Sequence, residues 1–201
     1  GAIDTVISHN HIYRTGRGIW LDWMAQGARV TGNLLHDTAP AGDLFVEVNH
    51  GPLLVDNNLF LSPTSLEVNS QGGSYVHNLI TGSVYVIHTE GRQTPYHPAH
   101  STEVAGLADN PSGDERYYNN IFVNGGPSAY DPATLPVFMA GNVFLHGAQP
   151  SKHEPEPLVL PQVNPAVQLL EKPDGLYLAI TLDTAWSQPP RQVVTTERLG
   201  K

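Results

Sequence analysis

The 201-residue chain contains no cysteine, which excludes disulfide bridges, thiolate nucleophiles and cysteine-ligated zinc sites. Only 14% of its residues are charged, against roughly 25% in an average soluble protein, and this disfavours long solvent-exposed helices. No run of 18 apolar residues occurs, so no transmembrane helix is predicted. The hydrophobic share of 40% still suffices for a buried core. We therefore expect a globular protein rich in β-strands.

Basic residues are also scarce, because 10 lysines and arginines stand against 19 acidic residues for a net charge of -9. That charge repels phosphate backbones and anionic membrane surfaces, so we expect neither nucleic acid nor membrane as a partner. The first residues, 1–5, have neither the basic nor the apolar region of an export signal. A cytoplasmic location is the resulting expectation.

The sequence does contain a repeat, in which an asparagine is followed by a short apolar run. The spacings between successive asparagines are 23, 25, 20, 42 and 22 residues. The members are Asn10, Asn33, Asn58, Asn78, Asn120 and Asn142. Further short alternating strands lie between them, separated by Gly, Asn and Asp turn residues, which gives two or more strands per coil.

A period near 22 residues with several short strands and no helix predicts an all-β fold, a parallel β-helix with coils of about 20–25 residues. The asparagines are interpreted as a structural ladder that satisfies backbone groups from coil to coil. The gap of 42 is close to two periods. Either one coil has lost its asparagine, or an excursion replaces it, for which residues 94–100 are the candidate.

Two regions are expected. Residues 1–148 contain the coils and the active site, whereas residues 149–201 differ in composition and lack the asparagine repeat. The second region begins as a proline-rich connection and continues with strands predicted at 163–170, 175–182 and 192–196. We expect these strands to cover the C-terminal end of the solenoid, which otherwise exposes a strand edge. Residues 4–8 run directly into the first repeat with nothing to cap it, so the chain is expected to be part of a longer protein.

Three acids occupy the same point of the alternation in the second strands of successive coils: Asp22, Glu47 and Glu67. Side chains alternate between the faces of a strand, so all three are predicted on the outer surface. Adjacent coils lie about 4.8 Å apart, close to the 5 to 5.5 Å that retaining glycosidases need between their two carboxyl groups. Asp22 and Glu47 meet this condition, whereas Asp22 and Glu67 would be near 10 Å apart.

Residues around these acids are candidates for binding a sugar. Trp20 and Phe45 flank the acids on one side as a stacking wall, and His50 and His88 could donate hydrogen bonds to hydroxyl groups, although a lone histidine is more often structural. The full set of substrate-binding candidates is Trp20, Trp23, Met24, Phe45, Asn49, His50 and His88. His97 and His100 have a spacing sometimes used for metal, but Pro98 forbids a helix there. No metal or cofactor is expected, and the roles of Glu67, Glu90, His97 and His100 stay open.

Four stretches around these candidates, residues 8–13, 16–27, 43–52 and 55–58, resemble glycoside hydrolase family 120, the β-xylosidases. Residues 97–106, 117–123 and 194–201 are similar to the same family, so the resemblance covers nearly the whole chain. It implies a right-handed parallel β-helix, interrupted in the family by a β-sandwich domain. It also implies retaining hydrolysis that releases xylose from the non-reducing end of β-1,4-xylo-oligosaccharides.

The same resemblance assigns roles, with Asp22 as the nucleophile and Glu47 as the acid/base. Family members are several hundred residues long, so the N-terminal coils and the sandwich are absent from these 201 residues. We therefore expect a homo-oligomer or association with a complementary chain that carries the missing part. Two alternatives remain open: a β-helix polysaccharide lyase with a Lys, Arg or Tyr base, often beside Ca²⁺, and a non-catalytic carbohydrate-binding β-solenoid.

Overall fold

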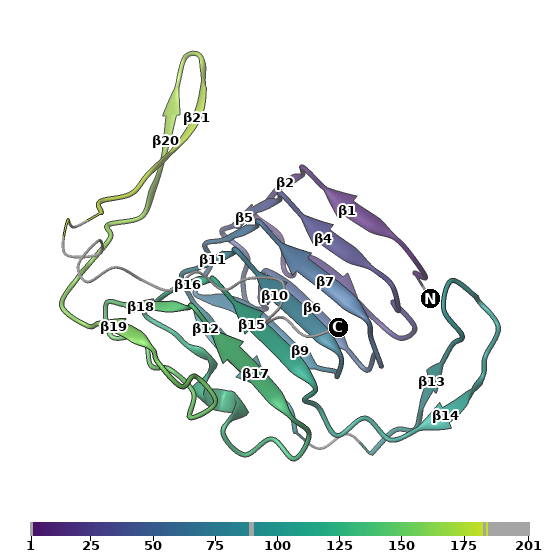
Figure 1. Ribbon diagram of the computed structural model, residues 1–201. Coiled ribbons are helices and arrows are strands. Elements are labelled where there is room, and N and C mark those ends of the chain that lie inside the picture. The colour runs from purple at the N-terminus through teal and green to yellow at the C-terminus, as the bar shows by residue number, and fades with distance from the viewer. Residues whose placement is uncertain (1, 89–90, 183, 185–201) are drawn as a thin grey trace.

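The computed structural model describes residues 2–88, 91–182 and 184, and its strands wind into the stacked coils of a parallel β-helix (Figure 1). Three parallel sheets run along the stack, and two antiparallel hairpins project from it. The fold is thus all-β, as the repeat predicts. Its one helical element in the described part is the short 3-10 helix η1 (Pro127–Tyr130), and no helix there is long and apolar enough to cross a membrane.

Each sheet takes one strand from each coil that it covers. Sheet A consists of β1 (Val6–Ser8), β4 (Arg29–Thr31), β7 (Leu53–Asp56), β10 (Gly73–Val76), β15 (Glu115–Tyr118) and β17 (Val137–Ala140). Sheet B consists of β2 (His11–Tyr13), β5 (Leu34–His36), β8 (Leu59–Phe60), β11 (Leu79–Ile80), β16 (Ile121–Val123), β18 (Val143–Leu145) and β19 (Leu158–Leu160). Sheet C consists of β3 (Ile19–Leu21), β6 (Leu44–Glu47), β9 (Thr64–Asn69) and β12 (Ser83–Val86).

The repeated asparagines form the predicted ladder between sheets A and B. At each rung the side-chain oxygen accepts hydrogen bonds from the preceding asparagine. The backbone N–H and the amide of Asn58, for example, donate to Asn78 Oδ1 at 2.9 and 3.0 Å. The amide of Asn58 also donates to the Val30 carbonyl at 2.9 Å. Bonded asparagines are 23, 25, 20, 42 and 22 residues apart, so the ladder follows every spacing of the repeat.

The last rung of this ladder is a carboxylate. Asn142 donates from its amide to Glu154 Oε2 at 2.6 Å and from its backbone N–H to Oε1 at 3.3 Å. Burial raises the pKa of Glu154 above its ordinary value, and the Asn142 hydrogen bonds oppose that rise. Glu154 thus supplies the acceptor that a further asparagine would supply, and it ends the ladder.

The 42-residue gap is an excursion, because Asn78 bonds directly to Asn120 and no coil is missing between them. The excursion leaves the solenoid after β12 and contains an antiparallel hairpin of β13 (Thr94–Tyr96) and β14 (Gly106–Ala108). Figure 1 shows it extending away from the coils at the lower right, with its tip near the N-terminus. Residues 94–100, the candidate from the sequence, lie in it.

The interior of the solenoid is filled by apolar residues from all three sheets. Sheet C ends two coils before sheet A, and η1 packs against β12 where the next strand of sheet C would lie. Tyr130 of η1 is completely buried and its hydroxyl lies 3.1 Å from that of Tyr117. Helix η1 therefore closes the core at this end of sheet C.

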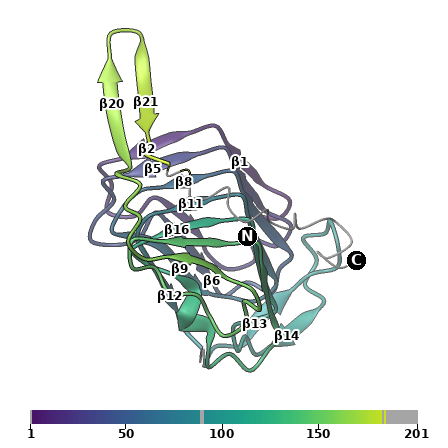
Figure 2. The same ribbon diagram turned by 60° about the vertical axis from the view of Figure 1, so that its left-hand side comes forward.

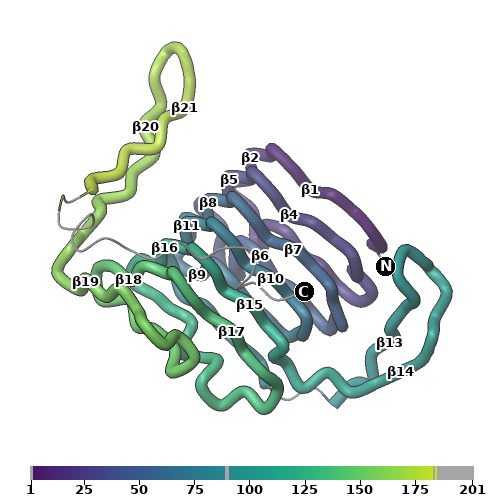
Figure 3. The backbone as a smooth tube through the Cα atoms, in the orientation of Figure 1, coloured from purple at the N-terminus to yellow at the C-terminus, as the bar shows by residue number. Residues whose placement is uncertain are grey.

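The sequence predicts that the C-terminal strands cover the end of the solenoid. The hairpin of β20 (Gln168–Lys172) and β21 (Gly175–Ala179) lies elsewhere. It projects beside sheet B toward the N-terminal coils (Figures 2 and 3). The strand that precedes it, β19, pairs in parallel with β18 and continues sheet B past residue 148. The strand predicted at 192–196 lies outside the described residues.

The ladder predicts a large stability loss for Asn78→Ala. The change leaves the N–H of Asn58 and the carbonyl of Val55 without their buried partners, so we expect the free energy of unfolding to fall by about 3 kcal/mol. Urea denaturation followed by circular dichroism measures it. Asn164→Ala, at an exposed asparagine, is the matched control and should change stability by less than about 0.5 kcal/mol. Equal losses in the two variants would contradict the structural role of the ladder.

A buried carboxyl group makes stability depend on pH. Burial raises the pKa of Glu115 well above 4.5, and the Gly73 amide and Arg116 offset only part of this effect. The group therefore contributes most to stability below its unfolded pKa, and this contribution is lost as the pH rises through the folded pKa. Glu115→Gln removes this dependence. We expect the stability of the variant relative to wild type to increase between pH 5 and pH 9 in urea denaturation, and a constant difference would contradict it.

Candidate active site

The two predicted catalytic acids lie at equivalent positions of adjacent coils. Strands β3 and β6 pair in parallel with Trp20 opposite Phe45 and Leu21 opposite Val46. Asp22 follows Leu21 and Glu47 follows Val46, so the two residues occupy the next position of the same register. Asp22 is exposed and Glu47 is half-buried, while Leu21 and Val46 are buried in the core. The sheet therefore brings both acids to its outer face, one strand spacing apart.

The backbone around Asp22 changes direction immediately after the strand. Asp22 Oδ1 accepts a hydrogen bond from the backbone N–H of Trp23 at 2.9 Å. Strand β3 ends at Leu21, and Met24, with a φ of 61° in the left-handed region, does not continue the extended backbone. Trp23 and Met24 are half-buried beside Asp22.

Both oxygens of Glu47 have partners. The indole N–H of Trp20 donates to Oε2 at 3.0 Å, and Arg92 donates to Oε1 at 2.8 Å. The Glu47 side chain is 15% exposed and that of Arg92 is 44% exposed, so the ion pair lies at the edge of the solvent. The carboxylate is held in one orientation by one partner from the neighbouring coil and one from the excursion.

Arg92 reaches Glu47 because the excursion runs back along the solenoid. Gln26 exchanges two hydrogen bonds with the backbone of His97, at 2.9 and 3.0 Å. His50 Nε2 donates to the Thr94 carbonyl at 2.9 Å. The excursion begins at the end of the fourth coil. These contacts attach it to residues of the first two coils. Arg92 is a site residue that the sequence did not single out.

The aromatic wall predicted beside the acids is present but partly covered. The rings of Trp20 and Phe45 stack with centroids 6.0 Å apart. The guanidinium of Arg17 lies 4.4 Å from the Phe45 centroid and 5.4 Å from that of Trp20, and it forms an ion pair with Glu67. Phe45 therefore has an arginine against its ring, whereas Trp20 remains 55% exposed.

Asn49, a substrate-binding candidate from the sequence, is buried and does not lie on the outer face with the acids. Val48 has a φ of 47°, which breaks the alternation and turns the next side chain into the protein. Asn49 is 1% exposed, its Oδ1 accepts from the Ala25 N–H at 2.6 Å, and its amide donates to the carbonyls of Leu21 and Glu47 at 2.9 Å each. It fastens the ends of β3 and β6 together, and so positions the backbone beside both acids.

The histidines singled out in the sequence do not gather around the acids. His88 Nε2 donates to the Ala129 carbonyl at 2.6 Å beside η1, and no contact brings it to the acids within the described residues. His97 Nδ1 donates to the Glu103 carbonyl at 2.8 Å, and His100 pairs with Asp4 at 3.0 Å. No three or more His, Asp or Glu residues are placed to hold a metal ion in the part of the chain that the structure describes. Glu90 lies outside that part.

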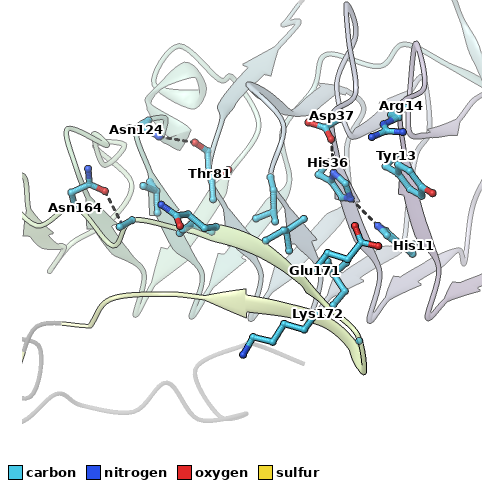
Figure 4. Close-up of a pocket in the computed structure, with 18 of the residues that line it drawn as sticks. His11, Tyr13, Arg14, His36, Asp37, Thr81, Asn124, Asn164, Glu171 and Lys172 are labelled. Atoms are coloured by element: carbon cyan, nitrogen blue, oxygen red, sulfur yellow. Dashed lines mark hydrogen bonds and ion pairs between the residues drawn. The ribbon is translucent and has the colours of Figure 1, made fainter.

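A large cavity lies elsewhere, between sheet B and the hairpin β20–β21 (Figure 4). Its volume is about 1330 Å³, and His11, His36, Asp37, Glu171 and Lys172 are among the residues that line it. None of the predicted site residues lines this cavity. Asp22 is exposed and the Glu47 side chain is 15% exposed, and both acids lie outside this cavity.

Comparison with solved structures finds a chain that superposes on 92% of this protein with a TM-score of 0.86 and 36% sequence identity, in the structure of XylC in complex with xylose. The chain is similar to XylC. It covers 33% of the length of the XylC chain. No protein-family model and no curated protein matches. The likeness to XylC confirms the resemblance indicated by the sequence motifs, together with the β-helix fold.

The Trp20 contact gives a test of how Glu47 is held. Trp20→Phe keeps an aromatic ring but removes the N–H that donates to Oε2. For the β-xylosidase activity that we propose for this face, we expect kcat/KM on an aryl β-xyloside to fall roughly tenfold, as for the loss of one hydrogen bond to a charged group. Phe138→Leu is the control, because Phe138 is also an exposed ring beside an arginine but lies on sheet A. Equal activities in the two variants would show that the indole N–H does not position Glu47.

Proposed function

We propose that the chain carries the catalytic face of a retaining β-xylosidase, which releases xylose from the non-reducing end of β-1,4-xylo-oligosaccharides. The observation that carries the proposal is the equivalent placement of Asp22 and Glu47 on paired strands of adjacent coils. One strand spacing is about 4.8 Å, which agrees with the carboxyl separation of retaining glycosidases and is shorter than that of inverting ones. The likeness to XylC, whose structure contains xylose, supports xylose as the sugar.

In this mechanism Asp22 attacks the anomeric carbon while Glu47 donates a proton to the leaving oxygen. A covalent xylosyl-enzyme intermediate forms, and Glu47 then removes a proton from the water that releases xylose. Glu47 must carry a proton in the first step and none in the second. Arg92 donates to Glu47 Oε1, and its side chain is 44% exposed, which leaves room for it to move away from that oxygen between the two steps.

The neighbouring residues support these two roles. Asn49 fixes the backbone at the ends of both strands, and Trp20 holds Glu47 through its N–H. Trp20 also presents an exposed ring beside the acids, on which the apolar face of a pyranose can stack. Trp23 and Met24, which follow Asp22, are proposed to contact the same sugar. His50 is proposed to position the excursion through Thr94.

Azide rescue tests the two roles separately. With an activated aryl β-xyloside, Asp22→Ala should lose more than about 1,000-fold in kcat, and added azide should give the α-xylosyl azide. Glu47→Ala should be rescued to give the β-xylosyl azide, because azide then attacks the covalent intermediate. NMR identifies the anomer of each product. An inverted first product from the wild type would overturn double displacement, and undiminished turnover in both variants would place the site elsewhere.

Ultraviolet absorbance and a binding measurement separate the proposal from the two other β-helix functions. A lyase would release an unsaturated product that absorbs in the ultraviolet, and a binding module would retain xylo-oligosaccharide affinity with no turnover. Either outcome would contradict the glycosidase assignment.

A further inference from the structure

A column of side chains crosses the outer face of sheet C at a single register position. Trp20 lies opposite Phe45, Phe45 opposite Glu67, and Glu67 opposite Tyr85, on strands β3, β6, β9 and β12. The two ends of this column are exposed aromatic rings, with Trp20 at 55% and Tyr85 at 60%. Tyr85 is thus a large exposed ring on the face that carries the acids, two strands from Glu47.

The proposed function gives this column a direction. Asp22 is the residue that bonds to the anomeric carbon, so the xylose to be released lies nearest β3. Glu47 protonates the oxygen of the leaving group, so the leaving group lies on the Glu47 side. The next strands on that side are β9 and β12. The remainder of an oligosaccharide therefore extends over Glu67 and toward Tyr85.

Two features of the column can contact such a chain, the Arg17–Glu67 pair and the ring of Tyr85. The Arg17–Glu67 pair lies next to β6, and its side chains, 29% and 20% exposed, present N–H donors and carboxylate oxygens to hydroxyl groups. Tyr85 follows one strand further on. From β6 to β12 is two strand spacings, about 10 Å. That distance is beyond the first leaving sugar and places the Tyr85 ring beneath a second one.

We propose that Tyr85, with the Arg17–Glu67 pair, forms a leaving-group subsite for xylo-oligosaccharides. The Arg17–Glu67 pair binds hydroxyl groups of the first sugar of the leaving group, and the ring of Tyr85 stacks on the apolar face of the second. Phe45 cannot take this stacking role, because the guanidinium of Arg17 lies against its ring. The inference rests on the proposed function and adds to it a preference for longer substrates.

The dependence of activity on substrate length tests the subsite. Tyr85→Ala should raise KM for xylotriose and xylotetraose about five- to tenfold, with kcat unchanged. Xylobiose, which reaches only the first leaving position, and an aryl β-xyloside should change less than twofold. Tyr85→Phe keeps the ring and should behave like the wild type on all four substrates. Phe138→Ala, at an exposed ring of sheet A, is the matched control.

The outcomes distinguish the subsite from the function on which it rests. Unchanged KM for xylotriose and xylotetraose in Tyr85→Ala would overturn the subsite while leaving the xylosidase intact. An equal loss on all four substrates would also overturn it, because it would indicate a general structural effect. If the wild type hydrolyses no xyloside at all, the proposed function itself fails.

Discussion

The structure depends on the fixed register between one coil and the next. Parallel pairing sets the spacing of the strands, and the asparagine ladder holds that register at the turn between sheets A and B by joining each coil to the following one through buried hydrogen bonds. A shift of one residue would move every side chain to the opposite face. With the register fixed, residues far apart in the sequence occupy equivalent positions, and the distance between them is set by the backbone.

This constraint explains how the outer face of a sheet can hold a pair of acids at a set separation. Asp22 and Glu47 do not need a deep cavity to be kept at a set separation, because the backbones of β3 and β6 set it. Asn49 adds a second fastening at the ends of the same two strands. The flexible part of the arrangement is the direction of each carboxylate, and for Glu47 that direction is set by Trp20 and Arg92.

The parts of the fold that repeat could be predicted from the sequence, and the parts that interrupt the repeat could not. The asparagine spacing predicts the coils, and alternation correctly places Asp22 and Glu47 on the outer face. The prediction for Asn49 fails because Val48 has a left-handed backbone, and a pattern of apolar and polar residues does not reveal such a conformation. Arg92 could not be found, since the path of the excursion depends on tertiary contacts such as those of Gln26 and His50. The hairpin β20–β21 could be predicted from its turn, but its position beside sheet B could not.

The excursion also affects how the molecule can fold. Stacked repeats contact mainly their neighbours, so a solenoid can gain or lose coils one at a time. Here contacts between residues 71 and 96 positions apart in the chain join the excursion to the first coils. Closing loops of that length costs entropy that only later contacts repay. Because Arg92 reaches Glu47 across the coils between them, we expect the face that carries Asp22 and Glu47 to be completed late in folding and to be among the first features lost when the coils begin to separate.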